Sequence, residues 1–257
     1  MPATPSRARP SSTVRALPGL AWSLLEALAD LALPDVCAAC DERPGPLCAA
    51  CVADLRAGLF DRPRSVMPDP APPDFPSVVA AGPYAGVLRS LVSAYKDDER
   101  RDLRPLLARL LAGPLVVACA APGTLVVPMP SSRAAVRRRG DDPVADLARA
   151  AVKVASSSGA GGTPLIMAPA LRPVRRMADQ SRLDHRQRAA NLAGAYAVRS
   201  RWQGRLDGCQ VVLVDDVVTT GATLAEAARA IRAAGGAVAG AATLAATRRR
   251  RDGVTAP

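Results

Sequence analysis

Short apolar runs and longer amphipathic segments alternate along residues 77–246. The short runs occur at 77–82, 124–130 and 211–214, and the segments between them place apolar residues at helical spacing. A short continuous apolar run predicts a strand buried on both faces, whereas 3.6-residue spacing predicts an amphipathic helix. This alternation predicts an α/β fold in which helices flank a parallel sheet.

Start and stop signals define the helices between these strands. Asp142 is a predicted N-cap with Pro143 at the first helical position, and Gly235 and Gly236 end the last helix. Residues 237–246 can return as a final strand. The predicted helices are at 84–95, 102–112, 142–156 and 222–234.

The chain outside this region has other patterns. Residues 1–16 are rich in Pro, Ser and Arg, which predicts disorder. Residues 17–60 combine an amphipathic helix with a cysteine cluster. The dense group of Pro at 61–76 predicts a stiff linker or surface loop and the domain boundary. The main domain then covers 77–247, and 248–257 form a basic tail.

Composition places the chain among globular proteins. Hydrophobic residues make up 49% and charged residues 22%, which excludes a collagen, an elongated coiled coil and a wholly disordered chain. No unbroken run of about 18 apolar residues occurs, so a multi-span membrane protein is excluded. The apolar stretch at 17–33 resembles an export signal, but Glu26 and Asp30 interrupt it and no clean cleavage site follows. We expect a cytoplasmic protein with reduced thiols.

The net charge is strongly positive but selects no single partner. Lys and Arg total 34 against 23 Asp and Glu, a net charge of +11. Such a balance favours nucleic acid, anionic membranes or phosphorylated small molecules. All the basic residues except Lys96 and Lys153 are Arg, and Ala is abundant, a bias that a GC-rich genome also produces.

The segment 211–223, VVLVDDVVTTGAT, carries the clearest chemistry. A buried strand is predicted to end in two adjacent carboxylates, Asp215 and Asp216, before a turn rich in Thr and Gly opens a helix. Ligands of such sheets bind beyond the carboxyl ends of the strands. The carboxylates can accept hydrogen bonds from sugar hydroxyls or bind a hydrated Mg²⁺.

The turn supplies the other half of this site. The free N–H groups at a helix N-terminus hold a phosphate, and Thr219, Thr220 and Thr223 add hydroxyl donors. Gly221 lets the backbone approach closely. Together with the carboxylates, the loop predicts a ribose 5-phosphate ligand. The alternative is a strand–turn–helix in which these Asp and Thr residues merely cap the helix.

Four cysteines form a second candidate site with the spacing CxxC-x7-CxxC. Four thiolates suit a tetrahedral Zn²⁺, and a reducing cytosol disfavours disulfides. Redox use of the thiols and an iron–sulfur cluster remain alternatives. A metal here would have a structural role or form a docking surface. The four residues are Cys37, Cys40, Cys48 and Cys51.

The 211–223 motif resembles the phosphoribosyl-pyrophosphate (PRPP) signature of type I phosphoribosyltransferases, which has an apolar strand, two acidic residues and a Thr-Thr-Gly-x-Thr/Ser turn. With the paired CxxC motifs, the whole of residues 20–247 resembles the ComF family of competence-associated, phosphoribosyltransferase-like proteins. The other matching features are Tyr84-x-Gly86, Lys96, Val127-Pro-Met-Pro130, Arg139-Gly140, Gln180, Arg186, Arg188, Asn191 and Gly194.

This resemblance implies a role for each segment. Asp215 and Asp216 would be the catalytic pair that holds the ribose hydroxyls and Mg²⁺. Where many members read Arg-Gly-Phe-Asn-Gln, this chain reads Arg139-Gly-Asp-Asp-Pro143. The implied PRPP-binding residues are Asp215, Asp216, Val217, Val218, Thr219, Thr220, Gly221, Ala222 and Thr223. The implied residues of the pyrophosphate-side and mobile loops are Pro130, Ser131, Arg137, Arg138 and Arg139.

Two functions follow as hypotheses. The first is a Mg²⁺-dependent phosphoribosyltransferase that binds PRPP and transfers ribose 5-phosphate to an unidentified acceptor. The second is a non-catalytic accessory of DNA uptake that handles single-stranded DNA with the competence machinery and uses PRPP only as a ligand. An enzyme needs a hood for the base, which no segment of the sequence shows, whereas DNA binding weakens steeply with salt. A PRPP-responsive regulator of transcription is weaker, since no helix-turn-helix pattern occurs.

Overall fold

A computed structural model describes most of the chain after residue 35. The described residues are 36–42, 45–119, 121–131, 140–157, 165–174 and 193–247. Several predictions lie outside them: the disorder at 1–16, the helix around 17–33, the loop residues Arg137, Arg138 and Arg139, the segment 180–191 and the basic tail.

The described chain contains five α-helices, two short 3₁₀ helices and eight strands. In chain order they are α2 (Ala49–Gly58), β1 (Arg64–Val66), β2 (Val78–Pro83), α3 (Gly86–Asp97), η1 (Arg101–Leu103), α4 (Arg104–Ala118), β3 (Leu125–Pro128), α6 (Pro143–Ser157), β4 (Ile166–Met167), β5 (Leu171–Pro173), β6 (Tyr196–Val198), η2 (Ser200–Trp202), β7 (Gln210–Val218), α8 (Ala222–Arg232) and β8 (Ala237–Ala246). None of these helices is both long and apolar enough to cross a bilayer.

Six strands form one sheet in the order β1-β2-β8-β7-β3-β4. All neighbours are parallel except β1 and β2. The central strand β7 pairs with β8 and β3 and is therefore hydrogen-bonded on both edges. A separate antiparallel pair joins β5 to β6. The architecture is a mixed, mostly parallel α/β sheet, as the alternating pattern predicted.

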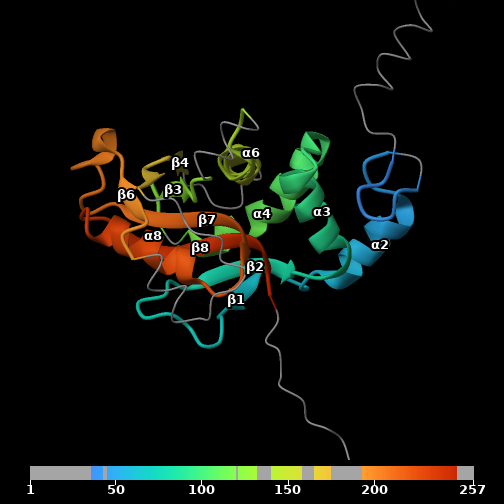
Figure 1. The fold of residues 1–257 in the computed structure, drawn as a ribbon, viewed down its shortest axis with the longest axis horizontal. Helices are drawn as coiled ribbons and strands as arrows, with labels where there is room; N and C mark the ends of the chain where they lie inside the picture. The colour runs from blue at the N-terminus through green and yellow to red at the C-terminus, as the bar shows by residue number, and fades with distance from the viewer. Residues whose placement is uncertain are drawn as a thin grey trace, which may run out of the picture.

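Helices cover both faces of the sheet, and β7 presents apolar residues to each of them. On one face, Val211 and Leu213 pack in a cluster with Leu224 and Ile231 of α8. On the other, Val212 and Val214 pack with residues of α3, α4 and α6. Figure 1 shows α8 on one side of the sheet and these three helices on the other. A parallel sheet needs this double cover.

Most predicted elements occur within a few residues of their expected bounds, but the end of the central strand differs. The strand expected at 211–214 continues to Val218 in β7, so Asp215 and Asp216 lie within the strand rather than at its end. The reason is pairing: the ten-residue β8 offers partners as far as Ala246, opposite Val218. The β-branched residues after the aspartates favour this extension.

The Pro-rich segment 61–76, called the strap below, belongs partly to the sheet. Within the expected linker, β1 pairs antiparallel with β2, with Arg64 opposite Ala80. Pro is compatible with this position because β1 is an edge strand. Farther along, the Nη1 of Arg232 in α8 donates to the carbonyl oxygen of Asp74 at 2.9 Å. The strap therefore runs from the edge of the sheet to α8.

The cysteine cluster packs against the main core. Cys51 and Leu55 are the buried residues of α2, and Leu55 lies in the same apolar cluster as Leu88 and Leu91 of α3. Arg100 adds a polar link, since its Nη2 donates to the carbonyl oxygen of Val36 at 3.1 Å. The segment before the strap is thus attached at the end of α3.

Candidate functional site

The turn between β7 and α8 has the geometry of an anion cradle. Gly221 has a φ of +74°, in the left-handed region, and directly precedes α8. The N–H of Ala222 donates to the Oγ1 of Thr220 at 3.5 Å, a bond within the turn, whereas the N-cap Gly221 supplies no side-chain cap. The other N–H groups of the first turn have no partner within the helix. They are available to an anion at its positive end.

Glycine at position 221 is required by the strap as well as by its φ. A Cβ built on Gly221 would lie 2.4 Å from the ring of Phe75 and 2.9 Å from the ring of Pro68. The sequence predicts that Gly221 lets other groups come close to the backbone. In the structure, the groups that come close are the rings of Phe75 and Pro68 in the strap. The strap packs directly behind the turn and limits where its backbone can lie.

The two carboxylates are arranged by the backbone of β7. The N–H of Asp216 donates to Oδ1 of Asp215 at 2.9 Å, and the N–H of Val217 donates to Oδ1 of Asp216 at 2.8 Å. Asp216 is 6% exposed, and its Oδ2 lies 2.7 Å from the Nζ of Lys96. Lys96 comes from the last turn of α3, more than a hundred residues earlier in the chain.

The electrostatics of these groups are coupled. Burial, together with the neighbouring charge of Asp216, raises the pKa of Asp215 well above its ordinary value, and the charge of Lys96 only partly opposes this. Burial by itself would lower the pKa of Lys96, but the carboxylates of Asp216 and Asp215 raise it. Lys96 therefore stays a cation, and the site attracts a further cation or hydroxyl donors to stabilise both carboxylates.

A pocket of about 460 Å³ joins this acidic pair to the turn at 219–223, which is called the phosphate loop below because the sequence predicts a phosphate ligand there. It brings together the aspartates, the hydroxyls of Thr219 and Thr223, and Pro130 and Ser131 after β3. Its full lining is Tyr84, Val92, Ser93, Lys96, Asp97, Met129, Pro130, Ser131, Val144, Tyr196, Asp215, Asp216, Val217, Thr219 and Thr223. This volume suits a small-molecule ligand.

The remaining members of the predicted PRPP-binding segment do not line this pocket. Val218 lines a different pocket. Ala222, the first residue of α8, is buried in a core cluster, and Thr220 and Gly221 shape the turn. The structure adds Tyr196, to which the 211–223 motif gives no clue. Burial, followed by the charge of Asp215, raises the pKa of this tyrosine.

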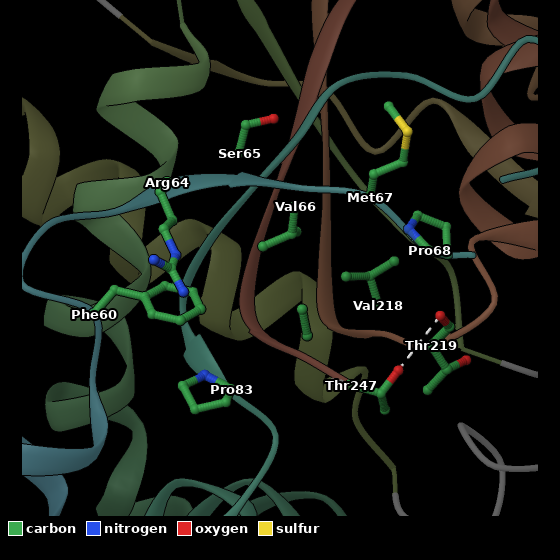
Figure 2. A pocket seen from close by; sticks show the side chains of 11 residues that line it. Phe60, Arg64, Ser65, Val66, Met67, Pro68, Pro83, Val218, Thr219 and Thr247 are labelled. Carbon is green, nitrogen blue, oxygen red and sulfur yellow. Dashed lines mark hydrogen bonds between the residues drawn. The ribbon is translucent and has the colours of Figure 1, made fainter. Parts of the chain in front are cut away.

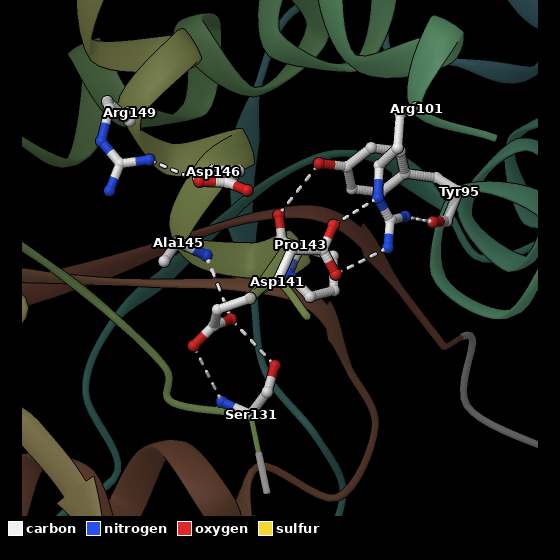
Figure 3. Close-up of polar contacts among 9 residues, drawn as sticks. Tyr95, Arg101, Ser131, Asp141, Pro143, Ala145, Asp146 and Arg149 are labelled. Carbon is white, nitrogen blue, oxygen red and sulfur yellow. Dashed lines mark hydrogen bonds and ion pairs between the residues drawn. The ribbon is translucent and has the colours of Figure 1, made fainter. Parts of the chain in front are cut away.

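The loop after β3 is closed at its base by the residues that depart from the family pattern. Asp142 accepts hydrogen bonds from the Oγ of Ser131 at 2.8 Å and from the N–H of Ser131 at 3.3 Å; Figure 3 labels Ser131 and marks both bonds with dashed lines. The same carboxylate accepts the N–H of Ala145 at 3.4 Å, as predicted for the N-cap of α6. Asp142 therefore joins the two described ends of the loop.

Asp141 is engaged by an arginine of η1. The Nε and Nη2 of Arg101 contact its two carboxylate oxygens at 2.6 and 3.0 Å, and Arg101 also donates to the carbonyl oxygen of Tyr95. The hydroxyl of Tyr95 in turn donates to the carbonyl oxygen of Pro143 at 3.1 Å. Asp141 and Asp142 thus fix the described residues on either side of the loop through contacts within the protein.

The four predicted metal-ligating cysteines converge. The sulfurs of Cys37, Cys40, Cys48 and Cys51 all lie within 4.8 Å of one another. Those of Cys40 and Cys48 are 3.7 Å apart, close to the ~3.8 Å edge of a tetrahedron with Zn–S bonds of ~2.3 Å. Burial opposes ionisation of Cys37, but N–H groups of the following turn and of Cys48 lower its pKa to about 6. The donor set and its spacing fit a single zinc ion.

A family model and two solved structures match parts of the chain. The model of the phosphoribosyl transferase domain matches residues 145–256. Among solved structures, an allosteric regulatory enzyme of purine biosynthesis is 20% identical, covering 55% of this chain and 25% of that one, with a TM-score of 0.30. The orotate phosphoribosyltransferase of Aeropyrum pernix is 16% identical, covering 77% and 93%, with a TM-score of 0.31.

A curated relative matches most of the chain, including the segment before the phosphoribosyl transferase match. The DNA utilization protein YhgH of Salmonella typhi is 30% identical over 224 residues, which are 83% of this chain and 90% of that protein. The chain described here has the four-cysteine cluster toward its N-terminal side and the phosphoribosyl transferase match toward its C-terminal side. Similarity of this extent, over both parts, means that the chain belongs to the ComF family of proteins with a phosphoribosyltransferase domain.

Proposed function

We propose that this protein binds PRPP with Mg²⁺ and transfers its ribose 5-phosphate to an acceptor. The observation that carries the proposal is the shared pocket of the aspartate pair, the phosphate loop and the loop after β3. The aspartate pair offers oxygens that accept hydrogen bonds from hydroxyl groups. The phosphate loop offers donors for a phosphate, and the loop after β3 forms a polar wall. PRPP presents the matching groups: a diol, a 5-phosphate and a diphosphate.

The residues would divide the work by charge. The 5-phosphate would lie at the start of α8 with the hydroxyls of Thr219 and Thr223, while Asp215 and Asp216 accept hydrogen bonds from the ribose hydroxyls and orient the ring. The diphosphate would face Ser131. Mg²⁺, when bound, supplies positive charge to the diphosphate and to the carboxylates.

The transfer step is a substitution at C1 of the ribose. The acceptor's lone pair forms a bond to C1, and the C1–oxygen bond breaks, so that pyrophosphate leaves with the electron pair. The protein's part is to hold the ring and to stabilise the charge that develops on the leaving group. Lys96 contributes a cation beside the carboxylates. Arg137, Arg138 and Arg139 remain the proposed residues of the covering loop.

Calorimetry with PRPP, with and without Mg²⁺, tests the proposal. We expect binding in the micromolar range that requires Mg²⁺. The variant Asp215→Asn/Asp216→Asn should weaken binding by roughly 100-fold, since two charge-assisted hydrogen bonds are lost. Asp98→Asn is the matched control, because this exposed carboxylate follows α3 but does not line the pocket. Equal affinity of the double variant and the wild type would refute the site.

Two observations favour a second function. The relative from Salmonella typhi is described as a DNA utilization protein, and this chain has a net charge of +11. A non-catalytic protein that handles single-stranded DNA would bind oligonucleotides with an affinity that falls steeply with salt. It would bind PRPP without releasing pyrophosphate in the presence of any acceptor. Pyrophosphate release in an acceptor screen therefore separates the two functions.

We also propose that the four cysteines hold a structural Zn²⁺. A single ion that shares four ligands brings their sulfurs within about 4 Å of each other, whereas cluster ligands on separate iron atoms lie farther apart. The spacing here, 3.7 Å between Cys40 and Cys48 and at most 4.8 Å for any pair, is closer to that of a single ion. All four ligands come from one short segment, so the ion would close that segment into a compact unit beside α3.

A further inference from the structure

A second pocket lies on the other side of the phosphate loop. It has a volume of about 390 Å³ and sits between the strap and the ends of β2, β7 and β8 (Figure 2). Its lining consists of Phe60, Arg64, Ser65, Val66, Met67, Pro68, Pro83, Val218, Thr219, Ala246 and Thr247. Of the lining residues in the part of the chain that the structure describes, the two pockets share Thr219 alone. Most of its lining comes from residues before the phosphoribosyl transferase match at 145–256.

The chemistry of this lining is selective. Among the described residues that line it, Arg64 is the only charged one and none is acidic. The guanidinium carbon of Arg64 lies over the Phe60 ring, 3.8 Å from its centre, so the cation is held on the face of an aromatic ring. Hydroxyls of Ser65, Thr219 and Thr247 are the other polar side-chain groups. The pocket therefore offers donors and a flat cationic surface, and it disfavours cations.

The rest of the lining is apolar. Val66 and Val218 pack into the core cluster that α8 covers, and Met67 is 71% exposed at the pocket. An exposed methionine beside a pocket is an adaptable apolar contact for a ring. Two apolar walls with one stacked guanidinium favour a flat ligand over a branched one, because stacking needs a planar partner.

This pocket also touches the start of the phosphate loop. The Oγ1 of Thr247 donates to the carbonyl oxygen of Thr219 at 3.5 Å, as Figure 2 shows, and the N–H of Thr247 donates to the carbonyl oxygen of Val218 at 3.0 Å. A ligand in the second pocket would therefore contact the residue at which the phosphate-binding turn begins. The two pockets share that residue but have separate walls.

We propose that the second pocket is a binding site for a flat heteroaromatic ring with carbonyl oxygens on its edge. The ring would stack on the guanidinium of Arg64, and its oxygens would accept hydrogen bonds from the hydroxyls of Ser65 and Thr219, since the hydroxyl of Thr247 already donates to a carbonyl oxygen. The inference goes beyond the proposed function, since it needs neither PRPP nor the aspartate pair.

Binding of uracil and hypoxanthine to the full-length protein tests this site, monitored by ligand-observed NMR without PRPP. A compound of this size is expected to bind with a dissociation constant on the order of 0.1–1 mM. Arg64→Ala should weaken binding by ~10-fold by removing the cationic stacking surface. Arg62→Ala is the matched control, because this exposed arginine lies two residues away and does not line the pocket. Cyclohexanone, which has the oxygen but no flat ring, should bind more weakly than either base.

The outcomes separate this inference from the proposed function. Loss of base binding in Arg64→Ala with PRPP affinity unchanged supports the second site. Base binding that survives Arg64→Ala but fails in Asp215→Asn would place the ring in the first pocket and overturn the inference. So would equal loss in Arg62→Ala and Arg64→Ala, or failure of both bases to bind. If PRPP does not bind but the bases do, the proposed function fails alone.

Discussion

At the scale of single residues, Asp216 illustrates how the site is held ready before any ligand arrives. One of its oxygens accepts the N–H of Val217, and the other pairs with Lys96 at 2.7 Å. A carboxylate that is 6% exposed needs such partners, because an unpaired buried charge is costly. The same cation lowers the cost of ionising Asp215, whose pKa burial raises. Lys96 is thus a positioning residue for the pair.

This arrangement predicts a pH effect of removing Lys96. The pKa of Asp215 is already raised, so PRPP affinity should increase with pH as this carboxyl ionises. In Lys96→Met the opposing positive charge is lost, the pKa of Asp215 rises further, and the profile of affinity against pH should shift to higher pH. Calorimetry from pH 5 to 8 measures the profile.

Lys153→Met controls for the loss of one positive charge elsewhere, since Lys153 is the other lysine of the chain and is exposed on α6. Its profile should match that of the wild type. A Lys96→Met variant whose affinity falls equally at every pH would show that Lys96 contacts the ligand but does not tune the carboxyl.

At the scale of elements, the strap connects an irregular segment to the phosphate loop. Its β1 pairs with β2, and its Phe75 ring lies where the Cβ of any other residue at 221 would be. Phe75→Ala should remove this support. We expect a loss of about 1–3 kcal/mol of stability from the cavity and a PRPP affinity that falls ~5-fold as the turn loosens. Thermal unfolding and calorimetry measure the two effects.

Phe75→Leu separates packing from ring shape, because it keeps most of the apolar volume. It should restore most of the stability and affinity. If Phe75→Ala lowers the unfolding temperature and PRPP affinity stays unchanged, the strap supports the fold but does not hold the turn.

The elements also show what local patterns can and cannot predict. Hydrophobic periodicity located β2, β3, α6, α8 and β8 within a few residues, because these elements bury whole faces. The extension of β7 to Val218 depended on pairing with β8, and the contact of Phe75 with Gly221 joins segments almost 150 residues apart. Neither feature can be predicted from the spacing of residues within one segment. The ion pair of Asp216 with Lys96 could not be predicted either, because the run of charges around Lys96 is also typical of a solvated surface.

At the scale of the whole molecule, the cysteine segment and the phosphoribosyltransferase domain share one apolar cluster. Leu55 of α2 packs with the core residues of α3, and Arg100 ties Val36 to the corner after that helix. Arg100 also binds Asp102 through two hydrogen bonds, at 3.0 and 2.9 Å, which fixes its orientation. Loss of order around Cys37 would therefore weaken the packing of the core against α3.

The last prediction follows from this attachment. If Zn²⁺ organises the cysteine segment, Cys37→Ser should release the metal and lower the free energy of unfolding by several kcal/mol, because metal binding is coupled to folding. Metal content by elemental mass spectrometry and thermal unfolding test this. Cys209→Ser is the control: its thiol lies outside the cluster and donates to the carbonyl oxygen of Arg205, a bond that a serine hydroxyl can also make. The control should keep one zinc per chain, whereas reduced wild-type protein without zinc, or a Cys37→Ser variant as stable as the control, would contradict a structural metal.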